Sequence, residues 1–96
     1  MFVELTKELE ESFPVYLVRR QEDIMNIEAS LERRDFQVVK VIGTKIQSNA
    51  TNFGMSALAN IGQTLATVAG DRKLDECQKL AQEMKTYIKE VKPKFI

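Results

Sequence analysis

The sequence predicts an all-α protein, an up-down antiparallel four-helix bundle preceded by one short extra N-terminal helix. Apolar residues recur at intervals of three and four along almost the whole chain, as they do in helices with one buried face. Strict alternation of apolar and polar residues, the strand pattern, is nowhere sustained. The chain also has only four Gly and two Pro, the residues that turns between strands need. We expect residues 1–96 to form a single small domain.

The first two helices are indicated by leucine spacing and by a proline. Leu5 and Leu9, four residues apart, predict a short helix over about residues 3–11. Pro14 suits the first turn of the next helix, because the N–H that proline lacks has no partner there in any helix. This second helix should continue to about residue 33. Its buried face is expected to hold Leu17, Ile24, Ile27 and Leu31.

The third helix has a signal at each end. Asp35 is a suitable N-cap, because its carboxylate accepts a hydrogen bond from a free N–H of the first turn. Asn52 and Gly54 stand where the helix should end, since both residue types tolerate the left-handed conformation. The apolar stripe on its inner side consists of Phe36, Val39, Ile42, Ile46, Ala50 and Phe53.

Two further helices complete the expected architecture. The fourth runs over about residues 56–69, where Gly70 should break it and Asp71 should cap the next. The last helix has the clearest pattern, and Pro93 should end it. The connections are only a few residues long, so neighbouring helices should be antiparallel. The inward residues are Leu58, Ile61, Leu65 and Val68, then Leu74, Cys77, Leu80, Ala81, Met84, Tyr87, Ile88 and Val91.

Histidine is absent from the chain, and its absence excludes several kinds of chemistry together. Imidazole is the commonest general base and the commonest metal ligand in proteins. A Ser/His or Cys/His catalytic pair is therefore impossible, as is a zinc site that uses imidazole. We expect no metal, no cofactor and no enzymatic activity.

Charge and cysteine content favour a cytoplasmic protein that binds neither nucleic acid nor membrane. Fourteen basic and fourteen acidic residues give a formal net charge of zero, so no general attraction to polyanions is built in. The N-terminal segment is acidic, unlike a signal peptide, and no apolar stretch approaches the ~20 residues of a membrane span. The single cysteine, Cys77, lies on an apolar stripe and is expected to be a buried structural thiol.

The outer face of the third helix is small and polar. A helix turns about 100° per residue, so Thr44 lies roughly 150° from the centre of the inner stripe and should point outward. Its neighbours three or four residues away are Lys40, Val41, Gln47 and Ser48. From periodicity alone this is a solvent-exposed helix face, and an exposed threonine does not by itself imply a function.

Residues 42–48 read I-G-T-K-I-Q-S, and residues 53–54 read F-G. In register and without a gap, this resembles the pattern I-G-H-K-L-K-G-x-x-x-x-[YFL]-G that histidine-phosphotransfer domains typically have in the helix that carries the phosphate. The resemblance to this family covers residues 16–87, about three-quarters of the chain. The resemblance implies a four-helix bundle and a role in two-component signalling, in which such domains exchange a phosphoryl group with a receiver-domain aspartate.

Three departures from the family pattern fall on this face. Thr44 stands at the histidine position, Gln47 replaces the lysine that helps neutralise the phosphoryl group, and Ser48 replaces the glycine that leaves room beside the imidazole. A phospho-imidazole passes its phosphate on readily, whereas phosphothreonine is a stable ester and an alkyl hydroxyl needs a base to attack. The sequence thus resembles a degenerate phosphotransfer domain in which Thr44 carries no phosphate.

The resemblance implies binding of a response-regulator receiver domain or a histidine kinase without transfer of phosphate. The expected partner-binding residues are Gln37, Lys40, Val41, Thr44, Lys45, Gln47, Ser48 and Met55. Two alternatives remain open. In one, the amide of Gln47 orients water for hydrolysis of an aspartyl phosphate on a receiver, although no acidic residue neighbours it at helical spacing. In the other, the chain is a structural unit that self-associates through Val41 and Met55.

Overall fold

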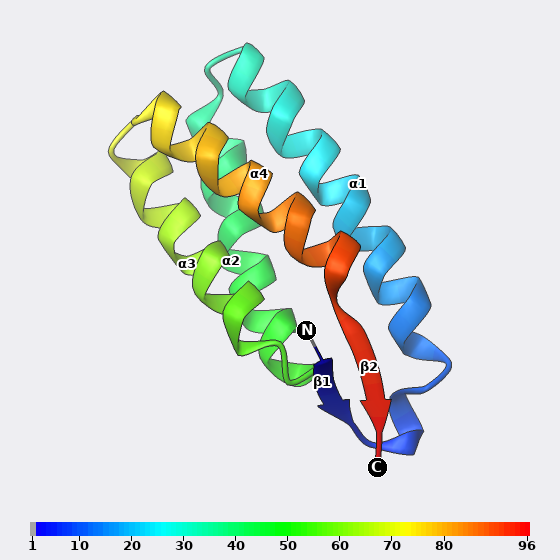
Figure 1. Ribbon diagram of the computed structural model, residues 1–96. Coiled ribbons are helices and arrows are strands. Elements are labelled where there is room, and N and C mark those ends of the chain that lie inside the picture. Colours follow the sequence, from blue (N-terminus) through cyan, green and yellow to red (C-terminus); the bar gives the residue numbers. More distant parts are fainter. Residues whose placement is uncertain (1) are drawn as a thin grey trace.

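The computed structural model describes residues 2–96, and most of them are helical (Figure 1). The expectation of a mostly helical chain with four long helices is confirmed. A short strand stands at each end of the chain, and a 3-10 helix follows the first strand. The elements in order are β1 (Phe2–Leu5), η1 (Lys7–Leu9), α1 (Ser12–Glu32), α2 (Phe36–Asn52), α3 (Ser56–Gly70), α4 (Leu74–Glu90) and β2 (Lys92–Phe95).

The four helices lie side by side along the long axis of a molecule that measures 41 × 19 × 18 Å (Figure 1). Short connections join them, so the chain reverses direction after each helix. Helix α1 packs against α2 and α4, and α3 packs against the same two helices. Two opposite sides of the molecule are therefore formed by the outer faces of α1 and α3.

Residues 2–5 form a strand, so the prediction of one helix over about residues 3–11 is wrong, and the helical part of that range is only the 3-10 turn at residues 7–9. Strand β1 pairs in parallel with β2 from the other end of the chain, with Phe2 opposite Lys92 and Leu5 opposite Phe95. Within β1, Val3 and Leu5 are buried while their neighbours are exposed. In the sequence, this alternation is too short to indicate a strand against the helical spacing of Leu5 and Leu9. The strand that pairs with it lies almost the whole chain away, so no local pattern reveals the pairing.

Pro93 lies two residues beyond the last helical hydrogen bond, in which Val91 N–H donates to Tyr87 O. Successive residues of a strand direct their backbone groups to opposite edges. Because Ile96 N–H donates to Leu5 O at 2.8 Å, the backbone groups of Pro93 point away from β1. The proline therefore removes no hydrogen bond from the sheet, and it leaves the outer edge of β2 without a donor at that position.

Of the two N-caps expected from the sequence, Asp35 is confirmed and Asp71 is wrong. Asp35 caps α2, accepting from Val38 N–H at 3.3 Å. Asp71 instead follows the end of α3, and Lys73 precedes α4 without a side-chain cap. The backbone turns at Arg34 and Arg72, which have left-handed φ values of 59° and 57°. Gly70 was expected to break α3 but is its last residue, because the reversal is made at Arg72.

Helices α2 and α3 touch through their backbones at Gly43 and Gly62. A Cβ atom on Gly43 would lie 2.8 Å from the carbonyl oxygen of Gly62, and one on Gly62 would lie 2.7 Å from that of Gly43. Real Cβ atoms do not approach backbone oxygens so closely, so each position accepts only glycine at this crossing. Around this contact the core is closed by fully buried side chains, among them Ile27, Val39, Ile46, Leu58, Leu65 and Met84.

Replacing Gly43 with alanine should destabilise the protein, because the new methyl group would force α2 away from α3. We expect the free energy of unfolding to fall by about 2 kcal/mol or more, as for other overpacked cores. Urea unfolding followed by circular dichroism would measure it. The matched control is Gly70→Ala, whose added Cβ would meet nothing within 4 Å. The control should leave stability unchanged or raise it by under ~1 kcal/mol, and equal losses in both variants would contradict the contact.

Removing the cap of α2 by Asp35→Ala should lower the free energy of unfolding by about 1 kcal/mol, since Val38 N–H loses its acceptor. Asp71→Ala is the natural comparison, because the same residue type precedes α4 in the sequence but caps nothing in the structure. We expect that variant to change stability by less than ~0.5 kcal/mol. The same unfolding measurement reports on both, and a larger loss from Asp71→Ala would refute this assignment of the caps.

Candidate functional site

The outer face of α2 is the surface that the sequence singled out, and most of its predicted residues are indeed on it. Thr44 is exposed, as its position on the helical wheel predicted, and the side chain of Gln47 is half-buried. Val41 is 42% exposed, and Val38, which is 37% exposed and three residues away, lies at the edge of the same face. We call this set of exposed residues the α2 outer face: Gln37, Lys40, Val41, Thr44, Lys45 and Ser48.

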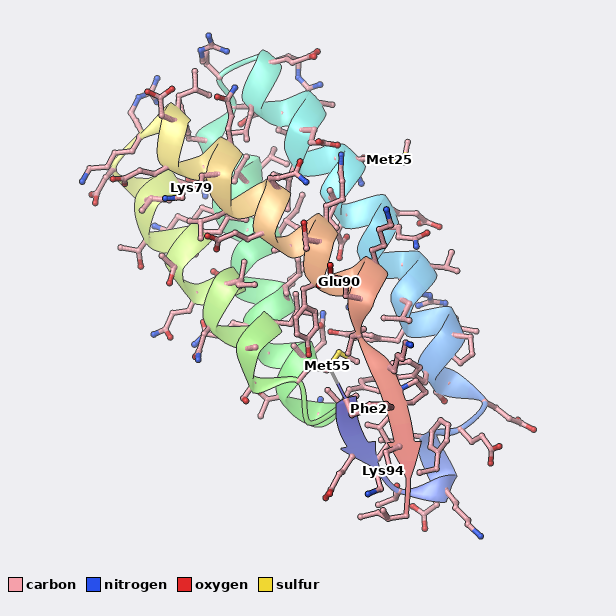
Figure 2. The ribbon with its side chains drawn as sticks, viewed as in Figure 1. Phe2, Met25, Met55, Lys79, Glu90 and Lys94 are labelled. Atoms are coloured by element: carbon pink, nitrogen blue, oxygen red, sulfur yellow. The ribbon has the colours of Figure 1, made fainter. Side chains whose placement is uncertain are left out.

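Met55 does not belong to the α2 outer face, so the expectation that it is exposed beside Thr44 is wrong. Its side chain is completely buried. Gly54 has a φ of 66° and turns the chain between α2 and α3, and Met55 N–H then donates to Ala50 O at 3.0 Å. This tight turn directs Met55 into the end of the core near the two strands (Figure 2). Met55 therefore stabilises the α2–α3 connection and offers nothing to a partner.

The hydroxyl of Thr44 is engaged with the backbone of its own helix. Thr44 Oγ1 donates to Lys40 O at 3.0 Å, and Thr51 and Thr67 make the same bond one turn back in their helices. The proton of the Thr44 hydroxyl thus points at a carbonyl oxygen rather than at a base. A nucleophilic hydroxyl needs a base to take that proton. The geometry at Thr44 is that of an ordinary helical threonine.

Gln47 lies at a small groove between α2 and α3 rather than on the open outer face. The groove encloses about 250 Å³. Amide and hydroxyl side chains line it, and none of its lining residues has a carboxylate. An amide that orients water for hydrolysis would need an acidic residue to assist, and this groove supplies the amide alone. The lining residues are Gln47, Thr51, Gly54, Ser56, Ala59, Asn60 and Gln63.

Tyr16 joins α1 to α2 through a cluster that sequence reasoning did not predict. Its ring stacks on Phe53 with centroids 4.2 Å apart, and its hydroxyl donates to Asn49 Oδ1 at 2.5 Å. The guanidinium of Arg20 lies 4.6 Å from the centre of the ring, and Arg20 Nε is 2.8 Å from Asp23 Oδ2. The spacing of Tyr16, Arg20 and Asp23 along one helix face was the available signal.

This cluster holds the half-buried Asn49 against α1 and forms one wall of an open cleft between α1 and α2. The cleft encloses about 510 Å³ and is bordered by Val15 and Arg19 of α1 as well as by Tyr16 and Phe53. Arg20 does not reach freely into solvent, because the aromatic ring and Asp23 hold it. The cluster fixes α1 against α2 and so sets the position of the α2 outer face.

Burial controls the titration of the groups around the core. It raises the pKa of the Tyr16 phenol, although hydrogen bonding and charge from Arg20 act in the opposite direction. Burial also raises the pKa of the Asp23 carboxyl, against the lowering influence of Arg20. The thiol of Cys77 is buried and its pKa is raised mainly by burial, so it stays protonated at neutral pH. The expectation of a buried cysteine is confirmed.

Within residues 2–96, no group of three or more His, Cys, Asp or Glu side chains is placed to hold a metal ion. Over the same residues, no helix combines the length and the apolar character needed to cross a bilayer. Comparison with known proteins found no matching family model, no matching curated protein and no matching solved structure.

We expect stability to fall as the pH rises above 10.0, the ordinary pKa of a tyrosine phenol. Burial raises the pKa of both Tyr16 and Tyr87, so above that pH the folded protein binds more protons than the unfolded chain. The contribution of the two protonated tyrosines to the free energy of unfolding is complete below pH 10. It is lost as the pH passes their raised pKa values. Urea unfolding between about pH 8 and pH 11 would show this decline. Tyr16→Phe should make it shallower, and an unchanged slope would exclude Tyr16 as its source.

Proposed function

We propose that this protein is a non-catalytic binding module of two-component signalling, an up-down helical bundle related in design to histidine-phosphotransfer domains. Its partner is the receiver domain of a response regulator, or a histidine kinase, and it docks on the α2 outer face. The observation that carries the proposal is the state of Thr44. This residue stands at the phosphate-carrying position of the motif, is exposed to a partner, and yet has its hydroxyl proton committed to Lys40 O.

The chemistry of the α2 outer face favours recognition over phosphoryl transfer. Transfer would need a nucleophile whose phosphorylated form is labile, and the chain has no histidine to serve as nucleophile or as base. Recognition needs only shape and complementary charge. Val41 supplies an exposed apolar contact, and small polar side chains around it let a partner helix approach closely.

The charges on the α2 outer face suit an acidic partner. Lys40 and Lys45 are exposed, and neither takes part in the ion pairs found among residues 2–96. The phosphate-accepting aspartate of a receiver domain and its phosphoryl group are negatively charged, and the two lysines complement that charge. Such rim charges act mainly on the association rate and on the choice of partner. The exposed face of one helix makes a small interface, typical of a transient signalling encounter.

The proposal predicts binding without transfer. Purified receiver domains from the source genome should be tested one by one by biolayer interferometry, together with the purified kinases. At least one should bind, and incubation with its radiolabelled phosphorylated form should leave this protein unlabelled. Val41→Asp should weaken that binding at least ~10-fold, because a buried unpaired carboxylate would replace the central apolar contact.

Thr64→Asp provides the matched control, since Thr64 is an exposed residue of α3 away from the α2 outer face and the new charge is the same. It should leave the affinity unchanged. Label appearing on Thr44 would overturn the non-catalytic assignment, and failure of every receiver and kinase to bind would overturn the choice of partner. Accelerated release of inorganic phosphate from the receiver, lost in Gln47→Ala, would instead identify a hydrolytic role for the α2–α3 groove.

A further inference from the structure

Helix α1 carries large apolar side chains on the side that faces solvent as well as on the side that faces the core. Val15 is 53% exposed, Val18 54% and Met25 68%. Their spacing of three and seven residues places them on one stripe, on the opposite side of α1 from the buried Ile24 and Ile27. Figure 2 shows Met25 pointing away from the other helices. No other described part of the chain covers this stripe.

The stripe has the spacing that a second helix needs. The stripe occupies positions 15, 18, 22 and 25, which are separated by three, four and three residues. This spacing is the pattern of a helix face that packs against a partner helix. Three of these four positions are apolar, and Glu22 is the exception. Met25 also borders a groove of about 330 Å³ between α1 and α4, whose lining includes Ile24 and Ile88, so the apolar surface extends beyond the stripe itself.

Two opposite charges lie at the middle of the stripe. Arg19 and Glu22 are both exposed and three residues apart. Neither belongs to the ion pairs that residues 2–96 form, which join Arg20 to Asp23, Lys73 to Glu76 and Lys85 to Glu28. A carboxylate in the centre of a docking seam requires a basic residue opposite it, because an unpaired charge there would be costly to bury.

The sequence of α1 supplies that basic residue when two copies of the helix are paired in opposite directions. With a two-fold axis near residue 20, Val15 of one copy lies opposite Met25 of the other. In the same register Glu22 of each copy lies beside Arg19 of the other, which makes two symmetric ion pairs at the centre. A parallel arrangement would instead place Glu22 against Glu22, and like charges repel. The stripe is thus complementary to itself in one orientation.

We propose that the outer stripe of α1, formed by Val15, Val18, Arg19, Glu22 and Met25, is the contact surface of an antiparallel homodimer. A surface of this kind, in which the same patch meets itself across a two-fold axis, is the commonest way in which soluble proteins form dimers. The dimer uses side chains of α1 that point away from the core. It therefore leaves the α2 outer face available, and it stands independently of the function proposed for that face.

Sedimentation equilibrium of the full chain over a wide concentration range tests the proposal. The wild-type protein should show a reversible monomer–dimer equilibrium. Glu22→Arg should weaken the dimer at least ~10-fold, because four like charges then meet at the centre, and Arg19→Glu should do the same. The double variant Arg19→Glu/Glu22→Arg exchanges the two charges and should restore the wild-type dissociation constant. Circular dichroism would confirm that each variant is folded.

Two valine variants form the matched control. Val18→Asp should abolish the dimer, whereas Val41→Asp, which places the same charge on a similarly exposed valine of α2, should leave it intact. A wild-type protein that stays monomeric at all concentrations would overturn the proposal. This holds even if α1 of that monomer binds a helix of another protein. A dimer that is insensitive to both single charge reversals, or that the double exchange fails to restore, would overturn it as well.

Discussion

The direct backbone contact between Gly43 and Gly62 fixes the crossing of α2 and α3, and the rest of the molecule is arranged around it. With no side chain on either residue, each carbonyl oxygen occupies the space that a Cβ atom of the other would need. The crossing turns Ile46 and Leu65 into the core and leaves Thr44 on the opposite side, facing solvent. Gly43 is also part of the I-G-T-K-I-Q-S motif on which the proposed function is based. Its presence there has a packing reason that holds whether or not phosphate is ever carried.

Two neighbouring helices present surfaces of different chemical character. The α2 outer face is mainly polar, with two lysines around Val41, whereas the outer stripe of α1 is mainly apolar with one acid and one base at its centre. The cluster of Tyr16, Arg20, Asn49 and Phe53 holds α1 and α2 together between these surfaces. These differences support the two proposals, a transient acidic partner for the first surface and a second copy of the chain for the second. On these proposals, self-association and recognition of a partner use separate surfaces of the same domain.

Most of the helical framework could be predicted from the sequence, because its signals are local. The spacing of apolar residues gave the inner side of each helix, including the buried position of Cys77 and the outward position of Thr44. Asp35 and Gly54 marked real helix boundaries, since a side-chain cap and a left-handed turn each depend only on residues within one turn. Asp71 is also a suitable N-cap residue ahead of a helix, but it caps nothing. Arg72 makes the left-handed turn, and α4 begins only after Lys73.

The sequence by itself therefore determined the four long helices and which side of each is buried, because helical periodicity is a property of neighbouring residues. Only the tertiary structure decided that residues 2–5 form a strand, since the partner strand at residues 92–95 lies at the other end of the chain. It likewise decided that Met55 is buried and that Gly43 meets Gly62. The physical reason is common to all three. Each depends on which distant segment occupies the adjacent space, and residue spacing within one helix or strand does not specify that neighbour.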